Sequence, residues 1–261
     1  MGSYRSPKRV TGEIRMRRLF IPTSEVESDL IIIDGSDAHY LLNVLRIEEK
    51  EEIIIFDGKG TEYLVEINKT SKTQVEGLIK DTYFVGQDTE VQVTLIQSIA
   101  KGDKMDYIIQ KCTEIGVGKI IPIITERTIV KLDAKKKKER KDRWQKIATE
   151  AAKQSKRVIV PEVTEILTLE ELIKKLDNTE KTLILWEDEN KTKMKEYLKK
   201  QESIENINII IGPEGGLSEA EVNKLQEKGA IAASLGSRIL RTETAGLVAL
   251  TIVLYELGEL G

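Results

Sequence analysis

Three segments of the sequence, two of which contain glycine, place charged side chains directly after short apolar runs that are typical of strands. They are Trp186–Glu189, Gly212–Gly216 and Gly236–Thr244. In a parallel α/β sheet, ligands bind beside the carboxyl ends of the strands, and glycine lets the backbone approach a ligand closely. An acidic side chain in each segment would repel a pyrophosphate but would tolerate a cation such as the sulfonium of S-adenosylmethionine. The pattern therefore indicates a ligand site whose charge favours S-adenosylmethionine over NAD or ATP.

The same segments do not match the known phosphate-binding patterns. The chain has no G-x-x-x-x-G-K-[ST] sequence, and Gly116-Val117-Gly118 lacks the third glycine of a dinucleotide fingerprint. Taken alone, Gly212–Gly216 could also be a tight turn without a ligand. Ser218 and Glu221 form an S-x-x-E pattern, which predicts a capped helix immediately after this segment.

The elements that must position these segments change in character near Gly86–Asp88. Before this boundary, apolar runs at Ile53–Phe56 and Tyr63–Ile67 flank Asp57–Gly60, which predicts a β-hairpin. The Ser36–Leu45 pattern predicts a helix that is capped by its first residue. The first part of the chain therefore has the pattern of a small barrel with an added helix.

After the boundary, apolar runs alternate with helical patterns. The predicted strands are Val91–Gln97, Ile120–Ile124, Thr182–Trp186, Ile207–Ile211 and Ala232–Leu235. The predicted helices are Met105–Ile115, Lys138–Ser155, Val222–Lys228 and Ala245–Leu257. This alternation predicts an α/β fold with a parallel sheet covered by helices on both faces.

Composition excludes several classes of protein. Charged residues make up 33% of the 261 residues and hydrophobic residues 40%, which excludes disorder as the main state. The longest apolar run, Ala245–Tyr255, is much shorter than the ~20 residues of a membrane-spanning helix. Residues 1–20 lack the apolar core of a secretory signal. With one cysteine, Cys112, and one histidine, His39, we expect no disulfide and no metal site, and we expect Cys112 to pack as a small apolar residue.

The net charge of −3 is unevenly distributed. Residues 1–20 carry +5 and residues 135–146 carry +6, so the rest of the chain carries −14. Two basic islands on an acidic body suggest a localised contact with a polyanion. For the 135–146 island, a solvated helix face is the alternative, and we favour it.

The glycine-bearing segments belong to a wider set of motifs. In this order along the chain, they closely resemble the RsmE family of 16S ribosomal RNA uridine-N3 methyltransferases, which is part of the SPOUT superfamily. The motifs are Arg17–Phe20, His39–Arg46, Lys101–Met105, Lys111–Gly116, Thr125–Arg127, Glu150–Ser155 with Arg157 and Pro161, Gly212–Ser218 and Leu235–Ala245. The resemblance covers about residues 16–258, so residues 1–15 are expected to be a leader or a disordered tail.

The resemblance implies a PUA-like β-barrel that binds RNA over residues 16–86. It implies a SPOUT methyltransferase domain with a deep trefoil knot over residues 87–261, and a homodimer that forms through the knot domain. The Ala245–Leu257 helix is consistent with such an interface, although a helix buried in a monomer core would have the same pattern. The implied partner is 16S rRNA, within the small ribosomal subunit in the cytoplasm.

The resemblance also implies which residues bind S-adenosylmethionine. The cofactor would lie bent in the knot, held mainly by backbone groups, with leucine and isoleucine side chains on either side of its adenine. The expected cofactor-binding residues are Leu185, Trp186, Glu187, Gly212, Pro213, Glu214, Gly216, Leu235, Gly236, Ile239, Leu240, Arg241 and Thr244. Ordinary packing at the sheet end is the alternative for each side chain.

Methylation at N3 of uracil sets requirements for catalysis. The imide N3–H is weakly acidic, so a base or an electrostatic stabiliser should assist. Glu243 could accept the proton, while Arg241 or Arg238 stabilises charge on the uracil oxygens. Arginine is an unsuitable base because it stays protonated. Glu243 could equally stabilise the start of the last helix, where acidic residues are favoured.

Contacts to RNA are expected from both parts of the chain, through basic residues of the family motifs. They are Arg17, Arg18, His39, Arg46, Lys101, Arg127 and Arg157. Phosphate contacts would position the RNA, and the target uracil would have to swing out of its stack. His39 could instead be a structural histidine.

Two other functions remain open from the sequence. The chain could be a catalytically silent RNA-binding assembly factor, although such a protein need not keep an intact cofactor pocket. It could also be a SPOUT methyltransferase that acts on another RNA or on a ribose 2′-OH. Identification of the methylated atom would separate these possibilities.

Overall fold

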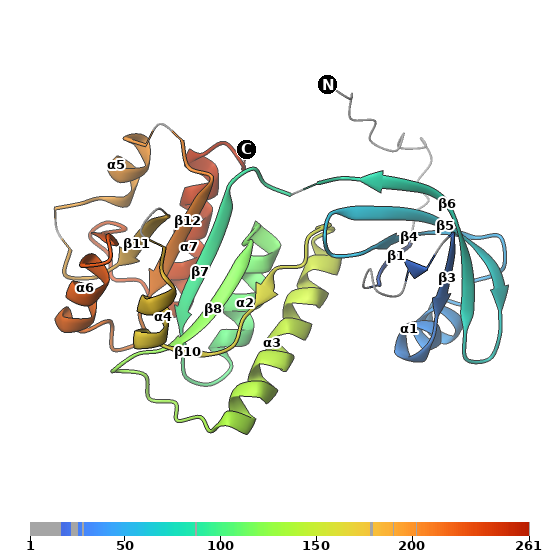
Figure 1. The fold of residues 1–261 in the computed structure, drawn as a ribbon, viewed down its shortest axis with the longest axis horizontal. Helices are drawn as coiled ribbons and strands as arrows, with labels where there is room; N and C mark the ends of the chain where they lie inside the picture. The colour runs from blue at the N-terminus through green and yellow to red at the C-terminus, as the bar shows by residue number, and fades with distance from the viewer. Residues whose placement is uncertain are drawn as a thin grey trace. The chain divides into compact units, whose positions relative to one another are not determined.

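The computed structural model describes residues 17–21, 26–27, 29–86, 88–177, 180–189, 191–201 and 203–260. The expected leader at residues 1–15 lies outside the described residues. The chain divides into two compact units, Met1–Val85 and Gly86–Gly261. Each unit has its own hydrophobic core, and each is described by itself (Figure 1).

The first unit is built on a six-stranded sheet with the order β1-β4-β5-β6-β3-β2. Its strands are β1 (Arg17–Phe20), β2 (Val26–Glu27), β3 (Leu30–Ile33), β4 (Glu52–Phe56), β5 (Thr61–Thr70) and β6 (Val75–Phe84). β1 and β4 are parallel, and the other neighbours are antiparallel. Tyr63, Val65 and Ile67 alternate into the core along β5, as expected for a sheet with one buried face.

The hairpin predicted at Asp57–Gly60 is confirmed. Asp57 Oδ1 accepts hydrogen bonds from Lys59 N at 2.7 Å and Thr61 N at 3.0 Å, which closes the turn between β4 and β5. Gly58 has a φ of +74°, a conformation that glycine adopts without steric cost.

The predicted helix at Ser36–Leu45 forms, but its details differ. It consists of α1 (Gly35–His39) followed by a single π-helical segment, η2 (Tyr40–Val44). The predicted cap is wrong, because Ser36 lies inside α1 and Asp34 occupies the N-cap position without a side-chain bond. Gly35 has a φ of +58° and makes the turn into the helix. The helix therefore begins one residue earlier in the chain than predicted.

The second unit contains a seven-stranded sheet in which every pairing is parallel. Its order is β10-β8-β7-β12-β11-β13, with β9 beside β8. The strands are β7 (Gln92–Ser98), β8 (Lys119–Ile124), β9 (Glu162–Val163), β10 (Leu167–Thr168), β11 (Lys181–Leu185), β12 (Asn206–Ile211) and β13 (Ile231–Ala233). The predicted α/β class is confirmed.

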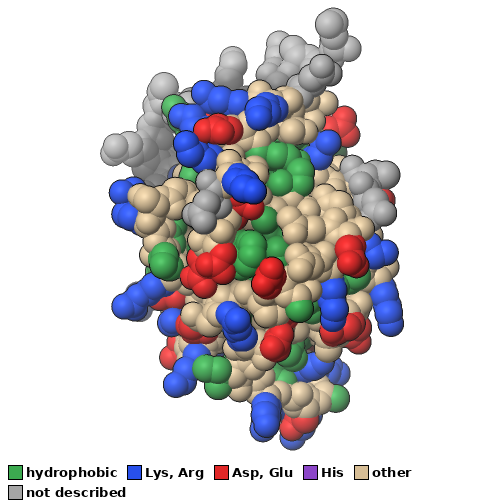
Figure 2. Space-filling view, turned by 90° about the vertical axis from the view of Figure 1, so that its left-hand side faces the viewer, with side chains coloured by type: hydrophobic (Ala, Val, Ile, Leu, Met, Phe, Trp, Pro, Cys, Tyr) green, Lys and Arg blue, Asp and Glu red, His purple; other side chains and the backbone are tan. Residues whose placement is uncertain are grey.

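Helices cover both faces of this sheet (Figure 1). They are α2 (Lys104–Ile115), α3 (Ala134–Gln154), α4 (Leu169–Lys175), α5 (Met194–Lys199), α6 (Glu219–Gln226) and α7 (Thr242–Glu256). One core lies under α2, α3, α5 and α7, and another lies under α4 and α6. Cys112 is buried in the first core, and burial raises its pKa to about 12, so it packs as an apolar residue as predicted. On the side of the molecule where α5 and α6 lie, acidic and basic side chains surround a patch of hydrophobic ones (Figure 2).

Several helix boundaries differ from the prediction, and α6 runs from Glu219 to Gln226 rather than from Val222 to Lys228. α3 begins at Ala134 rather than Lys138, because the Asp133 side chain caps it by accepting from Lys136 N. α7 begins at Thr242 rather than Ala245, so Glu243 lies in its first turn. The capping box of Ser218 and Glu221 at the start of α6 is confirmed. The trefoil knot that the resemblance implies stays a prediction.

Candidate cofactor pocket and active site

The three acid-bearing segments, Trp186–Glu189, Gly212–Gly216 and Gly236–Thr244, meet at one pocket of the second unit. They follow β11, β12 and β13, which are parallel neighbours and so end at the same edge of the sheet. The pocket has a volume of about 640 Å³, within the range of small-molecule sites. The residues that line it are Lys104, Leu185, Trp186, Glu187, Ile211, Gly212, Pro213, Glu214, Gly216, Leu217, Ala233, Ser234, Leu235, Gly236, Ser237, Arg238, Ile239, Leu240, Arg241, Thr242 and Ala245.

All but one of the predicted cofactor-binding residues line this pocket. The exception is Thr244, which lies in the first turn of α7 and donates its backbone N–H to Arg241 O at 2.9 Å. Glu243 is outside the lining as well, but it contacts the lining residue Lys104. The sequence therefore predicts most of the pocket lining, and Thr244 is the predicted lining residue that lies outside it.

The segment after β12 requires glycine at two positions. A Cβ on Gly212 would lie 3.0 Å from Leu217 N and 3.1 Å from Gly216 C, both of which are backbone atoms. Gly216 has a φ of +69°, and a Cβ there would lie 2.8 Å from Glu187 Oε1. Its N–H donates to Pro213 O at 2.9 Å. The segment is a tight turn, and it also forms a wall of the pocket.

The segment after β13 is open and exposed. Gly236 has a φ of +119° and open space where a Cβ would point. Ile239 is 80% exposed and the Arg241 side chain 83% exposed, although both line the pocket. An exposed apolar side chain at a pocket rim is available to cover a flat aromatic ligand.

Buried hydrogen bonds join the start of α7 to the segment after β12. Thr242 Oγ1 donates to Gly212 O at 2.7 Å and accepts from Gln97 Nε2 at 3.0 Å. Gln97 is fully buried at the end of β7. The ends of two strands far apart in sequence, β7 and β12, thus fix the position of Thr242 and, with it, the first turn of α7.

Charged groups cluster at the same place. Lys104 Nζ lies 3.0 Å from Glu214 Oε1 and 3.2 Å from Glu243 Oε2, and Arg241 Nη1 lies 4.0 Å from Glu243 Oε1. Burial alone would raise the pKa of Glu214, but hydrogen bonds from Lys104 and from the backbone N–H of Lys101 help to lower it. The hydrogen bond to Glu214 raises the pKa of Lys104. Both groups are therefore charged at neutral pH.

These features fit S-adenosylmethionine. Among the acidic side chains of the lining, Glu214 is paired with Lys104, whereas Glu187 has no ion pair among the described residues and suits a cationic ligand. The indole N–H of Trp186 is buried and has no hydrogen-bond partner among the described residues. Backbone groups beside glycines can form hydrogen bonds with the edge of an adenine.

Within the described part of the chain, no cluster of His, Cys, Asp and Glu side chains could hold a metal ion.

The predicted RNA-contacting residues of the first unit lie in different settings. Arg17 pairs with Glu51 at 2.6 Å. Arg18 pairs with Glu62, and its guanidinium lies 4.9 Å from the Phe56 ring centroid. The other two, His39 and Arg46, are exposed. A solvent-exposed His39 does not support the alternative of a buried structural histidine.

In the second unit, Lys101 and Arg127 lie beside the pocket. Both are exposed. The Lys101 backbone N–H donates to Glu214 Oε1, and Arg127 Nη1 donates to Gly215 O at 2.7 Å. They come from the segments after β7 and β8, which end at the same edge of the sheet as the pocket loops.

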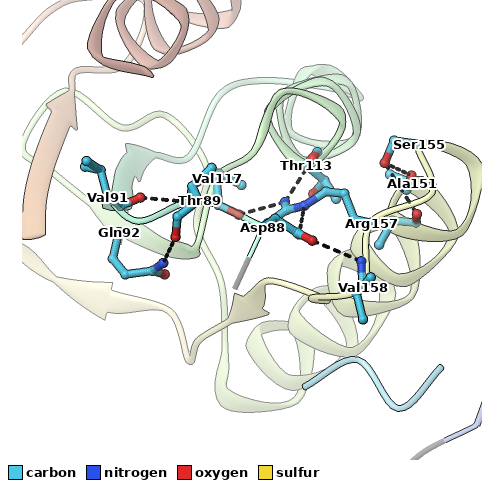
Figure 3. A network of polar contacts seen from close by, with 11 residues as sticks. Asp88, Thr89, Val91, Gln92, Thr113, Val117, Ala151, Ser155, Arg157 and Val158 are labelled. Carbon is cyan, nitrogen blue, oxygen red and sulfur yellow. Dashed lines mark hydrogen bonds and ion pairs between the residues drawn. The ribbon is translucent and has the colours of Figure 1, made fainter. Parts of the chain in front are cut away.

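Arg157 corrects one expectation. Its side chain is 8% exposed, and its guanidinium points into the protein (Figure 3). Nε donates to Asp88 at 2.7 Å, and Nη1 donates to the carbonyls of Thr113 and Val117 at 2.9 and 2.8 Å. These bonds tie the first residues of the second unit to the end of α2. Arg157 is thus a structural residue and no candidate for an RNA contact.

Sequence reasoning missed Lys104, Thr242 and Gln97 as residues of the site. Lys104 lies in the Lys101–Met105 motif, and Thr242 directly follows Arg241, so both were near residues already singled out. Gln97 is a polar residue at the carboxyl end of a predicted strand. That position could have indicated a residue beside the pocket. The contacts of Lys104 with Glu214 and of Gln97 with Thr242 each span more than a hundred residues of chain, and no local pattern encodes them.

Within the described ranges, no helix has both the length and the apolar character needed to cross a bilayer.

Comparison with known proteins connects the site to a family. Residues 87–254 match the family model described as an RNA methyltransferase domain, and residues 33–80 match an RNA methyltransferase PUA domain. Ribosomal RNA small subunit methyltransferase E of Bacillus subtilis is 36% identical over 248 residues, covering 92% of this chain and 97% of that protein. The protein of the same name from Synechocystis is 32% identical over 234 residues, covering 89% of this chain and 75% of that protein.

A solved structure agrees with these matches. The ribosomal RNA small subunit methyltransferase E of Neisseria gonorrhoeae, described as bound to S-adenosyl methionine, has 35% identity and a TM-score of 0.79. The match covers 92% of this chain and 97% of that chain. The chain therefore belongs to the family of RNA methyltransferases that includes ribosomal RNA small subunit methyltransferase E.

Proposed function

We propose that this protein transfers the methyl group of S-adenosylmethionine to N3 of a specific uridine in the 16S rRNA of the small ribosomal subunit. The observation that carries the proposal is the convergence of the three predicted segments on one glycine-walled pocket. The names of the relatives from Bacillus and Neisseria, and the cofactor named for the latter, support the substrate and the cofactor.

Cofactor binding is assigned mainly to the pocket loops. The backbone beside Gly212, Gly216 and Gly236 lies close enough to the pocket to bind a ligand without interference from side chains. Leu240 and Ile239 provide apolar surface for an adenine. When bound, S-adenosylmethionine supplies an activated methyl group on a sulfonium, so the protein mainly has to align the uracil nitrogen with it.

Glu243 is assigned as the base. Its side chain is 18% exposed at the start of α7, and Arg241 Nη1 lies 4.0 Å from its Oε1. In the proposed reaction Glu243 would take the proton of uracil N3 as that nitrogen accepts the methyl group, and the sulfur would leave as a neutral thioether when its bond to the methyl carbon breaks. Arg241 and Arg238, both exposed at the pocket, are free to approach the uracil oxygens and stabilise their charge. A helix-stabilising role for Glu243 is compatible with the same position.

RNA contacts are assigned to Arg17, Arg18, His39, Arg46, Lys101 and Arg127. Arg46 and His39 are exposed on the first unit, and Lys101 and Arg127 are exposed beside the pocket. We further propose a knotted homodimer that acts in the cytoplasm, where bacterial ribosomes are assembled. Tyr255, which is 65% exposed on the otherwise apolar α7, supports a protein contact on that helix.

The test is a product assay. Purified protein is incubated with labelled S-adenosylmethionine and either free 16S rRNA or small subunits that lack the modification, and the RNA is digested to nucleosides. We expect label in N3-methyluridine from one of the two substrates. Label in another nucleoside would assign a different methylation, and tight RNA binding with no label under any condition would favour a silent assembly factor.

A further inference from the structure

Lys104 occupies a position that the proposed reaction does not yet use. It is the first residue of α2, and it lines the pocket. Its ammonium contacts carboxylates from two separate segments: Glu214, after β12, and Glu243, in α7. A single cation thus bridges two acidic groups that are 29 residues apart in sequence, one in the pocket lining and one just outside it.

The two carboxylates depend on this cation. Glu243 Oε2 is buried, so its charge requires a nearby counter-ion. Arg241 is a weaker partner, because its side chain is 83% exposed and lies 4.0 Å from the other oxygen. Lys101 contributes only its backbone N–H, to Glu214. Without Lys104, two negative groups that now share one ammonium would repel each other.

The arrangement also distinguishes the two oxygens of Glu243. Lys104 contacts Oε2, while Oε1 lies toward the exposed Arg241. Lys104 is thus the ion-pair partner of Oε2, a buried oxygen that has no hydrogen bond among the described residues, and the other oxygen is left to accept a proton. The neighbouring bond from Thr242 to Gly212 O fixes the backbone of the same turn but not the direction of the Glu243 side chain.

We propose that Lys104 is a positioning residue for methyl transfer, which holds the Glu243 carboxylate in orientation and balances its charge against that of Glu214. This role rests on the proposed function, since it acts through the proposed base. It differs from a general stabilising role because it depends on the positive charge at this point, and because its loss can be offset by removing one of the two negative charges.

The chain offers a matched control on the same helix. Lys111 pairs with Glu114 at 2.8 Å, and the two side chains are 35% and 31% exposed, against 32% and 33% for Lys104 and Glu214. Lys111 does not line the pocket. Lys111→Met therefore removes a comparable ion pair from α2 without touching the site.

The first experiment measures single-turnover methyl transfer by the full chain at saturating S-adenosylmethionine. We expect Lys104→Met to slow transfer by about 100-fold, the usual cost of misplacing a reacting group. Lys104→Arg should restore most of the rate, and Lys111→Met should match the parent protein. Equal rates for Lys104→Met and the parent, or equal losses for the Lys104 and Lys111 variants, would overturn the proposal.

The second experiment tests charge balance. Glu214→Gln is added to Lys104→Met, and we expect the double variant to be faster than Lys104→Met alone, because one source of repulsion is gone. A double variant that is slower would show a merely structural role. If Lys104→Met does not fold, as judged by thermal unfolding, Lys104→Gln replaces it in both experiments. A parent protein that binds no S-adenosylmethionine would instead overturn the proposed function. If the parent binds the cofactor and reacts, the proposed function holds, and the variant rates then test the role of Lys104 alone.

Discussion

The pocket and the β-rich first unit both contain residues assigned to substrate, but they hold them in different ways. At the pocket, Gly212, Thr242 and Gln97 form buried hydrogen bonds that link β7, β12 and α7. On the first unit, Arg46 and His39 are exposed, and Arg17 forms a partly exposed ion pair. The first arrangement fixes atoms by buried hydrogen bonds, whereas the second places charge on a surface.

The difference indicates how each region contributes. Transfer chemistry requires the reacting atoms to be aligned, so small displacements in the pocket are costly. Attraction of an RNA backbone requires charge but little geometry, and its effect is spread over several residues. Single substitutions should therefore have large effects at the pocket and small, salt-dependent effects on the first unit.

The largest effect is expected from Glu243→Gln. Loss of a general base lowers the chemical step by about 10²–10⁴-fold, so single-turnover transfer at saturating cofactor should fall by that order. Glu256→Gln is the control, because Glu256 lies on the same helix, is 17% exposed against 18% for Glu243, and also pairs with a lysine. An unchanged rate in Glu243→Gln would exclude Glu243 as the general base, and its role would then be to stabilise the start of α7.

Gly212→Ala should come next. Its Cβ would meet backbone atoms of Leu217 and Gly216, which cannot move as a flexible side chain can. Overpacking of about 1–3 kcal/mol corresponds to roughly ten- to a hundred-fold weaker S-adenosylmethionine binding by calorimetry. Gly229→Ala strains a glycine outside the pocket lining (φ +83°) and serves as the control. Equal affinity in both variants would show that the turn does not shape the site.

A smaller effect is expected from Arg46→Gln. Its binding to 16S rRNA should weaken, and the slope of log K against log salt should fall by about 0.7–0.9 for one lost phosphate contact. Cofactor affinity should stay unchanged. Lys135→Gln removes an 87% exposed charge from the basic 135–146 island and should leave the salt slope as it is. A slope that changes for Lys135 but not for Arg46 would reverse the assignment of the RNA-binding surface.

The smallest effect concerns pH. Because the pKa of Glu214 is lowered, its contribution to stability is full above the ordinary value of 4.5 and is lost as pH falls through the lowered pKa. Because the pKa of Lys104 is raised, its contribution is full below 10.5 and is lost as pH rises through the raised pKa. The difference in unfolding free energy between the parent and Glu214→Gln should thus be level near neutral pH and shrink in acid. A difference that grows in acid would contradict the ion pair.

The sequence predicts the architecture well where local chemistry decides it. The Asp57–Gly60 turn, the Ser218 capping box and the parallel strands follow from turn residues, caps and apolar runs. The same reasoning overlooked α4, although Thr168 and Glu171 form the same capping box as Ser218 and Glu221. α5 was missed because its six residues are too few for a helical pattern.

The site could be predicted only in part. Glycine- and acid-bearing loops after strands are visible in sequence, and parallel strands bring such loops together. The partners of Lys104 and the burial of Arg157 depend on contacts between distant segments. Arg157 was expected to contact RNA because it is a basic residue of a family motif, and only the fold reveals that Asp88 and two carbonyls bind its guanidinium.

The most direct test of the central claim is calorimetric titration of the full chain with S-adenosylmethionine, in parallel with Gly236→Val. The account predicts saturable binding by the parent protein and its loss in the variant, because Gly236 has a φ of +119° and lines the pocket. Thermal unfolding of both proteins shows that the fold is kept. Absence of binding to the parent at millimolar cofactor, with and without RNA, would contradict the claim that these three loops form a methyltransferase site.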